Sequence, residues 1–398
     1  MLTNSTTLKQ RIGLAFSGGG VRAAAFHLGV LEKLFELKVL SKLDVISTVS
    51  GGSIVGAYYL INKENFEDFK QQMISNLQKS IELRIIFNWR ILLAILNPHY
   101  SRTKVKANVY DKLYFKKKKF SDLKSEPQII INATNITTGK NWKFSQHYMG
   151  DWKVGYEGKV TNFMVCDAVA ASTAVPGLFH PLRINVKKFF DKPNFSIKHL
   201  GLCDGGVYDN QGTHSLTSNY DKNKMCDYII CSDASSPFDD TPQRISLRLL
   251  NVLKRQSNVM MSRIKNMQFQ ELIYGGLKEK VNTAYFSINW TIDNLLKAFT
   301  TQEKLSKELG IWDFIAKFRD KDYKKISDLE FETAKGQIIT KLKYPELNNY
   351  LNSTEVVKIS SIGTRLFALS ESEILKLMKH GGSLCGFQVR TYLPELIN

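Results

Sequence analysis

Short apolar blocks along the chain alternate with longer stretches in which apolar residues recur at helical spacing. Residues 11–16 form an apolar run that predicts a buried strand, and a group of glycines follows it. Beyond the glycines, apolar residues return at Ala24, Leu28, Leu31 and Leu34, which is the period of an amphipathic helix. The start of the chain therefore predicts a strand, a glycine loop and a helix.

The same succession recurs as far as residue 240. Further apolar runs predict strands at 43–48, 127–135, 142–146, 200–204 and 227–235, and apolar stretches between them predict helices at 52–62 and 163–174. Strands that alternate with helices are typical of an α/β fold. We expect a three-layer α/β/α architecture in which a mainly parallel sheet carries helices on both faces.

One region within this alternation differs from it, and we expect it to be a helical, basic insertion at about residues 64–120. It contains a strongly apolar stretch at 80–97, which is either an ordinary buried helix or a segment that covers a functional site or lies in a membrane interface. It also contains four lysines between Phe115 and Phe120, which either contact phosphates or form a solvated loop.

The character of the chain changes again after residue 240. Residues 246–274 predict a long amphipathic helix, and residues 283–289 predict a strand that returns to the sheet. Ser370 and Glu373 have the spacing of a capping box at the start of a helix. We predict a core domain at residues 10–240. We expect a mostly helical C-terminal extension, residues 241–398, to pack on that domain.

Charge adds a constraint on partners. The 398 residues carry a formal net charge of +18, and the sequence pI is about 9.5. Excess positive charge favours anionic partners, either nucleic acid or anionic lipid headgroups, but it is equally typical of a lysine-rich surface that contacts only solvent. Hydrophobic residues make up 43% of the chain, which argues against a disordered protein.

The cysteines indicate a reducing compartment. Their number, five, is odd, and no Cys-x-x-Cys pair occurs, so we expect neither a disulfide framework nor a zinc site. The N-terminal residues lack the apolar region of a signal peptide, and no stretch approaches the roughly 18 apolar residues of a spanning helix. These features predict a cytoplasmic protein.

Ser50 stands where a predicted strand meets a predicted helix, and two glycines follow it directly. This is the setting of a nucleophile elbow, in which small neighbours expose the hydroxyl and the helix N-terminus favours a developing anion. The usual pattern is Gly-x-Ser-x-Gly, and Thr48 replaces its first glycine. A simple Ser-Gly-Gly helix cap is the alternative. Ser53 is a poorer candidate because it lies inside the predicted helix.

The glycine loop is a second candidate element. The backbone N–H groups of Gly18, Gly19 and Gly20 are placed to meet an anion at the start of a helix. The spacing also fits a loose dinucleotide-binding fingerprint, but that motif needs an acidic residue at the end of the second strand, and Asp44 opens that strand instead. An oxyanion hole uses the same physics for a tetrahedral intermediate.

Asp204 is the third candidate, because it ends an apolar run and precedes two glycines. A carboxylate at a strand end can serve as the general base for a serine, whereas the alternative is an ordinary Asp-Gly turn. Asp209, in the loop beyond, is less favoured. The histidines have no obvious catalytic setting. His214 would complete a Ser-Asp-His order, but it follows Asp204 by only ten residues in the same turn region.

In order and spacing these elements resemble the patatin-like phospholipases, and a bacterial subgroup of them in particular. The resemblance covers residues 10–240 well and the rest loosely. It rests on Gly18–Arg22, Thr48–Gly52, the Ala-Ser-x-Ala-x-Pro segment in Ala171–Leu182, Asp204–Gly206 and, for the subgroup, Ile362–Gly381.

The resemblance implies a patatin-like fold and a Ser-Asp dyad with no catalytic histidine. By resemblance Ser50 is the nucleophile and Asp204 the base. The N–H groups of Gly18, Gly19 and Gly20 would form the oxyanion hole. Arg22 would help to set the conformation of that loop. The implied reaction is hydrolysis of fatty-acyl esters of membrane glycerophospholipids through an acyl-enzyme at a peripheral membrane surface, without a metal or an organic cofactor.

Two other functions stay open at this point. One is a thioesterase or general esterase that uses the same dyad on soluble acyl substrates. The other is a non-enzymatic module that binds nucleic acid or a membrane; the presence of both Ser50 and Asp204 argues against it, and we do not expect nucleic acid as a partner. Bacterial relatives include secreted effectors and effectors of antiphage defence, so the resemblance also implies control by an activating partner or a nucleotide signal.

Overall fold

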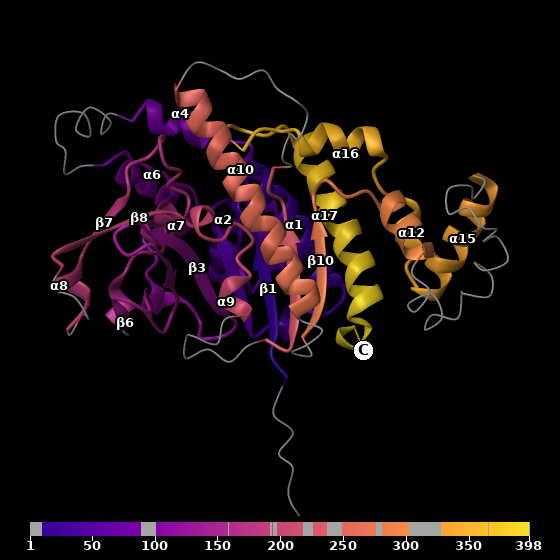
Figure 1. Ribbon diagram of the computed structural model, residues 1–398, viewed down its shortest axis with the longest axis horizontal. Coiled ribbons are helices and arrows are strands. Elements are labelled where there is room, and N and C mark those ends of the chain that lie inside the picture. The colour runs from indigo at the N-terminus through magenta and orange to yellow at the C-terminus, as the bar shows by residue number, and fades with distance from the viewer. Residues whose placement is uncertain are drawn as a thin grey trace, which may run out of the picture.

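An extended sheet forms the centre of the protein, and helices cover it (Figure 1). The computed structural model describes residues 10–88, 101–157, 159–191, 193, 197–217, 226–236, 249–275, 281–301, 328–364 and 366–397. The sheet has ten strands: β1 Ile12–Phe16, β2 Val45–Val49, β3 Gln128–Asn135, β4 Lys140–Phe144, β5 Met149–Asp151, β6 Gly155–Glu157, β7 Leu182–Asn185, β8 His199–Asp204, β9 Tyr228–Asp233 and β10 Asn282–Ser287.

The strands follow the order β10-β9-β1-β2-β3-β4-β5-β6, with β8 also pairing with β3 and β7 pairing with β8. From β10 to β3 every pairing is parallel, and beyond β3 every pairing is antiparallel. The apolar runs at β1, β2, β3 and β9 thus form the predicted parallel sheet, and the predicted return of a strand after residue 240 is confirmed by β10. The antiparallel part extends this sheet and makes it mixed.

The helices lie on both faces of the sheet, as expected for an α/β fold. Their bounds are α1 Gly20–Glu36, α2 Gly51–Asn62, α3 Phe66–Leu77, α4 Ile81–Ile86, α6 Arg102–Tyr110, α7 Val165–Ser172, α8 Val186–Phe189, α9 His214–Thr217, α10 Leu249–Gln270, α12 Ile292–Thr301, α15 Asp328–Lys341, α16 Ser353–Ser360 and α17 Glu371–Tyr392. Figure 1 shows α10 crossing in front of the sheet, and α12 and α15 at the far right.

Alternate residues of the parallel strands enter two separate apolar cores. Leu14 and Phe16 of β1 belong to the larger core, which α1 and α17 also line, whereas Ala15 belongs to the second core. The second core includes Leu216 of α9, and Phe269 of α10 packs against it. Burial of both faces explains why these strands read as continuous apolar runs rather than as alternating ones.

The C-terminal region is joined to the N-terminal part of the fold along α17. This helix packs along α1, beside β10 (Figure 1). Its start carries the predicted capping box, in which Ser370 Oγ accepts from the N–H of Glu373 and the Glu373 carboxylate accepts from the N–H of Ser370. Of the predicted apolar stretch at 80–97, α4 forms the first part, and residues 89–97 lie outside the described residues. Among the described helices, none has the length and apolarity needed to span a membrane.

Candidate active site

Ser50 occupies a sharp turn between β2 and α2. Its backbone has φ 48° and ψ −116°, a strained conformation for a residue with a side chain, and the structure retains it because close packing fixes the turn. A Cβ atom on Gly51 would lie 2.1 Å from the carbonyl oxygen of Gly20, so only glycine fits behind the serine. The sequence pattern of a nucleophile elbow is therefore present as an elbow in three dimensions.

Thr48, which departs from the usual elbow pattern, is accommodated by a second glycine. A Cβ atom on Gly56 would lie 2.6 Å from Cγ2 of Thr48, so the absence of a side chain on Gly56 leaves room for the threonine methyl group. The Thr48 hydroxyl donates to the carbonyl oxygen of Ile130 (3.3 Å) and accepts from Ser53 Oγ (3.0 Å). Ser53 lies inside α2, as predicted, and its hydroxyl is used within this packing.

The hydroxyl of Ser50 donates a hydrogen bond directly to the carboxylate of Asp204. The distance between Ser50 Oγ and Asp204 Oδ2 is 3.0 Å, and both residues are nearly buried, with exposed fractions of 8% and 6%. Asp204 ends β8, where Thr134 Oγ1 of β3 donates to its carbonyl oxygen (2.8 Å). Sheet pairing thus brings together two residues that are 154 positions apart in the sequence.

The electrostatic setting of Asp204 is balanced between burial and nearby donors. Burial raises the pKa of Asp204 from 3.8 to about 6, while the Gly206 N–H (2.8 Å from Oδ1), the Ser50 hydroxyl and the positive charge of Lys106 all favour the ionised form. The carboxylate has one oxygen fixed by Gly206 and the other directed at Ser50. A base with a pKa near 6 is ionised at neutral pH and accepts a proton more readily than an ordinary aspartate.

Three consecutive residues at the end of α7 hold the parts of this site together. Ser172 Oγ accepts from the backbone N–H of Ser50 (2.9 Å), and the carbonyl oxygen of Ala174 accepts from the backbone N–H of Asp204 (2.9 Å). Between them, the carbonyl oxygen of Thr173 accepts from the side chain of a buried lysine. The Ala-Ser-x-Ala-x-Pro segment therefore has a physical role, which is to fix Ser50 relative to Asp204.

The glycine loop lies against Ser50, but its donors are not equivalent. A Cβ atom on Gly18 would lie 3.2 Å from Cβ of Ser50, which places the loop in contact with the serine. The N–H of Gly18 donates to the carbonyl oxygen of Asn210 (3.0 Å), so the prediction that it is free for an oxyanion is wrong. The N–H groups of Gly19, with φ 146°, and of Gly20, at the start of α1, have no acceptor among the described residues.

Arg22 is almost fully buried. Its guanidinium donates to the carbonyl oxygens of Ser360 (2.8 Å), Ile362 (2.7 Å) and Ala234 (2.8 Å). Burial lowers the pKa of Arg22 to about 10, and the charge of Asp233 opposes this shift. Arg22 therefore ties the glycine loop to the end of α16 and to the segment that follows it.

The weaker candidates have structural partners of their own. The carboxylate of Asp209 accepts from the backbone N–H groups of Gln211, Gly212 and His214, which fixes the loop beyond Asp204. No histidine among the described residues hydrogen-bonds to Ser50 or Asp204. No group of three or more metal-ligating side chains occurs in the described part of the chain, and all five cysteines are buried and none of them forms a disulfide bond.

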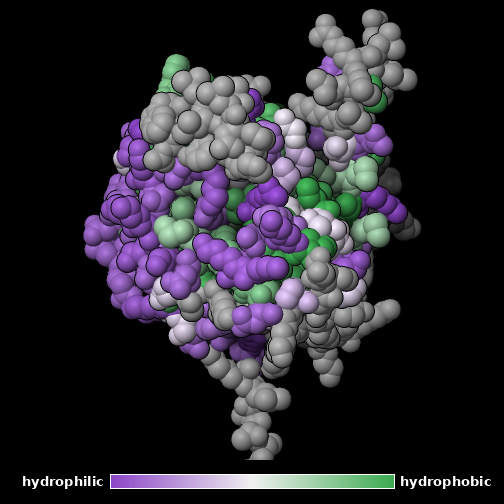
Figure 2. Space-filling model, turned by 90° about the vertical axis from the view of Figure 1, so that its left-hand side faces the viewer, coloured by the Kyte–Doolittle hydropathy of each residue, from purple (hydrophilic) through white to green (hydrophobic). Residues whose placement is uncertain are grey.

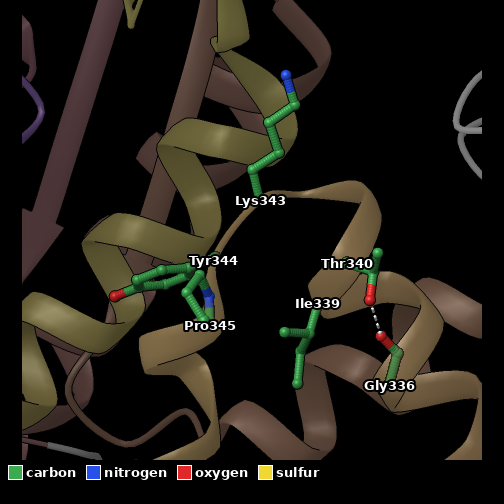
Figure 3. A pocket seen from close by; sticks show the side chains of 6 residues that line it. All are labelled: Gly336, Ile339, Thr340, Lys343, Tyr344 and Pro345. Carbon is green, nitrogen blue, oxygen red and sulfur yellow. Dashed lines mark hydrogen bonds between the residues drawn. The ribbon is translucent and has the colours of Figure 1, made fainter.

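A surface hollow of about 480 Å³ lies apart from this site. It is formed by the end of α15 and the turn that follows, and Figure 3 shows Thr340 hydrogen-bonded to Gly336 beside Ile339 and Lys343. None of its lining residues belongs to the elbow, the glycine loop or the Asp204 strand end.

The geometry has a counterpart among known families. The family model described as patatin-like phospholipase matches residues 14–217, just over half of the 398-residue chain. The chain belongs to the patatin-like phospholipase family. The matched region contains the elbow, the glycine loop and Asp204.

Three solved structures illustrate the range of similar proteins. Human GIVD cytosolic phospholipase A2 is 18% identical, with a TM-score of 0.33, over 41% of this chain and 28% of that chain. VipD from Legionella pneumophila is 12% identical, with a TM-score of 0.34, over 98% and 92%. ExoU of the Pseudomonas aeruginosa type III secretion system, in complex with SpcU, is 14% identical, with a TM-score of 0.26, over 93% and 76%.

Two parts of the site were not predicted from the sequence. Ser172 and Lys106 lie far from Ser50 in the chain and carry no motif that separates them from other serines and lysines. The signal closest to a prediction was the Ala-Ser-x-Ala-x-Pro segment, which contains Ser172 but does not reveal what its hydroxyl contacts.

Proposed function

We propose that this patatin-like protein is a phospholipase A-type enzyme, which cleaves fatty-acyl esters of membrane glycerophospholipids with Ser50 and Asp204 as a catalytic dyad. The observation that carries the proposal is the direct 3.0 Å hydrogen bond from Ser50 Oγ to Asp204 Oδ2 at a strained elbow. No intermediate group is needed to move the proton from the hydroxyl to the carboxylate.

In the first half of the reaction, Asp204 takes the proton of Ser50 as Oγ attacks the ester carbonyl carbon. The negative charge that develops on the carbonyl oxygen is met by the N–H groups of Gly19 and Gly20, assisted by the positive end of α1. When the tetrahedral intermediate collapses, the ester bond breaks and Asp204 returns the proton to the departing alkoxide. The lysophospholipid leaves, and the acyl group stays on Ser50 as an ester.

In the second half, a water molecule replaces the lysophospholipid next to Asp204. The carboxylate removes one proton from the water as its oxygen attacks the acyl-enzyme, and the same donors stabilise the second oxyanion. Collapse of this intermediate breaks the bond to Ser50 Oγ, which recovers its proton from Asp204. The products are a free fatty acid and the original enzyme.

A membrane substrate is supported by the apolar residues exposed around the dyad. Val175 and Leu178 follow the Ala174 carbonyl that holds Asp204, and Val207 lies three residues beyond Asp204; their exposed fractions are 42%, 64% and 41%. Isolated exposed apolar residues are common, but three so near one buried nucleophile suit an acyl chain entering from a bilayer. Figure 2 shows hydrophobic residues between hydrophilic ones on one side of the molecule.

The net charge of +18 also supports a membrane surface as the binding partner of this protein. Basic residues near a membrane that contains anionic lipids each contribute about 1 kcal/mol to binding. We propose that the protein binds the surface of such a membrane peripherally and extracts one acyl chain toward Ser50.

The test is fatty-acid release from vesicles of mixed zwitterionic and anionic phospholipids, comparing wild type with Ser50→Ala and Asp204→Asn. We expect both variants to lose at least about a thousandfold in rate, because the nucleophile and the base act as one unit and removal of either one abolishes the function of both. Ser41→Ala, at an exposed serine in a different part of the fold, serves as the control and should match wild type. Circular dichroism confirms that each variant is folded.

Full activity in Ser50→Ala would overturn the assignment of the nucleophile. Wild-type hydrolysis of soluble short-chain esters or thioesters with no release from vesicles would replace the phospholipase with a soluble esterase or thioesterase. If wild type releases nothing from either substrate, labelling of Ser50 by a fluorophosphonate decides the matter: unlabelled protein would contradict the dyad.

A further inference from the structure

Lys106 is a buried cation beside the dyad that the proposed reaction has not used. It lies on α6 with an exposed fraction of 0%, which is rare for a lysine because removing an ammonium from water is costly. Its Nζ donates to the carbonyl oxygen of Thr173 (2.7 Å) and lies 3.8 Å from the centre of the Phe179 ring. These contacts hold the charge in one place.

The position of the Lys106 ammonium is set by the segment 172–174, which also holds Ser50 and Asp204. Ser172 accepts from the Ser50 N–H, Thr173 from Lys106, and Ala174 from the Asp204 N–H. The positive charge of Lys106 and the negative charge of Asp204 act on each other. Asp204 raises the pKa of Lys106, whose burial lowers it to about 7, and Lys106 lowers the pKa of Asp204.

The acidic groups other than Asp204 on the elements packed around Lys106 are engaged elsewhere. On its own helix, Tyr110 donates to Thr173 Oγ1 (3.2 Å) and carries no charge, because burial raises its pKa. The neighbouring carboxylates and their partners are Asp167 of α7 with Lys104 (2.8 Å), Glu82 of α4 with the N–H of Leu366 (3.0 Å), and Asp111, which follows α6, with the N–H of Lys117 (2.7 Å). Within the described residues, the anion that faces Lys106 is therefore Asp204.

We propose that Lys106 is a positioning residue for the reaction: its buried ammonium keeps Asp204 ionised, and so able to accept the Ser50 proton, while anchoring the Thr173 carbonyl between nucleophile and base. This inference rests on the proposed dyad. A carboxylate buried as deeply as Asp204, with no cation nearby, would be protonated over more of the neutral range and would fail as a base. A buried lysine supplies the missing charge without contacting the substrate.

The test replaces the charge while keeping the shape. Lys106→Met removes the ammonium from the buried site, and Lys104→Met, two residues away on the same helix with 44% of its side chain exposed, is the matched control. The rate of fatty-acid release at saturating vesicle concentration is measured against pH. We expect the acidic limb of the pH–rate profile of Lys106→Met to lie about one pH unit higher than that of wild type. At pH values below the limb the rate should therefore be about tenfold lower than in wild type, and it should recover at higher pH.

A purely structural role for Lys106 predicts a different result, which is a lower rate at every pH with the limb unmoved; that outcome overturns the proposal. At saturating vesicle concentration the measured rate reports kcat alone. KM should not change. If Lys106→Met does not fold, Lys106→Gln keeps a donor to Thr173 without the charge, and it must show the same shifted limb. An active Ser50→Ala would refute the dyad itself, whereas an inactive Ser50→Ala with an unmoved limb in both Lys106 variants refutes only this inference.

Discussion

At the scale of single residues, Ser50 is held in place by its neighbours' lack of side chains. Gly51 approaches the carbonyl of Gly20 so closely that the elbow and the glycine loop form one packed unit. This contact fixes Ser50 relative to the N–H groups of Gly19 and Gly20. We therefore expect the rate of the proposed reaction to depend on this backbone contact as well as on the proposed dyad.

Gly51→Ala tests this contact. The new Cβ would lie 2.1 Å from the Gly20 oxygen, so the loop must move by an ångström or so, and a displacement of that size costs about a hundredfold in rate. Fatty-acid release is the measurement, with Gly336→Ala as the control, because nothing lies within 4 Å of a Cβ there. A Gly51→Ala enzyme with wild-type rates would show that the elbow and the loop are not coupled.

The sequence predicted the motif residues of the site better than their partners. Ser50, Asp204 and the glycines stand in short local patterns, and local backbone geometry produces such patterns. Gly18 was assigned a free N–H, but the carbonyl of Asn210, from the loop after β8, occupies it. Lys106 was not predicted at all, because its role depends on tertiary contacts, and these contacts produce no recognisable motif in the sequence.

At the scale of elements, continuous apolar runs identified the parallel strands, since burial on both faces demands them. The short strands β5, β6 and β7 were not predicted. Each has three or four residues, too few for an alternation to be recognised, and β6 and β7 follow from pairing with strands already in place. Long elements are specified locally, and short ones are specified by their neighbours.

The contact between α1 and α17 depends on small residues at the crossing. A Cβ on Gly381 would lie 2.3 Å from the carbonyl oxygen of Phe26, and a Cβ on Gly29 would lie 1.9 Å from that of Met378. The two backbones thus pack directly against each other. Such a close crossing joins the C-terminal region firmly to the helix that starts at the glycine loop.

Gly381→Ala should therefore destabilise the protein although it improves helix propensity. Overpacking at a backbone contact costs about 1–3 kcal/mol, which exceeds the roughly 1 kcal/mol gained by replacing a helical glycine. Urea unfolding measures the difference. Gly382→Ala, one position along α17, is the control, since its nearest neighbour outside the helix is at 3.3 Å. Equal stability of the two variants would contradict the close crossing.

At the scale of the whole molecule, the C-terminal region completes the fold of the N-terminal part. β10 pairs with β9 in the sheet, and the Arg22 guanidinium reaches the carbonyls of Ser360 and Ile362. The division into a domain at 10–240 and an extension at 241–398 stays a prediction. These contacts support the proposal that the extension is packed on the catalytic part.

Two buried histidines lie along this junction and should make the fold sensitive to acid. His27 of α1 receives a hydrogen bond from Ser232 Oγ (2.9 Å) and donates to the Ser17 carbonyl (3.0 Å), while His380 of α17 donates to the Ile288 carbonyl (2.8 Å). Burial lowers the pKa of each histidine to about 4, although both are ordinarily near 6.5. Each is neutral in the folded protein and takes up a proton on unfolding in mild acid.

Because the folded-state pKa is lowered, the stability from each histidine is complete above pH 6.5 and is lost as the pH falls toward 4. At about pH 5 the loss is about 2 kcal/mol per histidine. Urea unfolding of wild type at about pH 7.5 and pH 5 measures the total. His380→Gln keeps a donor for Ile288 but cannot be protonated, so it should lose about 2 kcal/mol less than wild type over this interval. The exposed His147→Gln is the control, and an identical pH dependence in His380→Gln and wild type would show that this histidine does not limit acid stability.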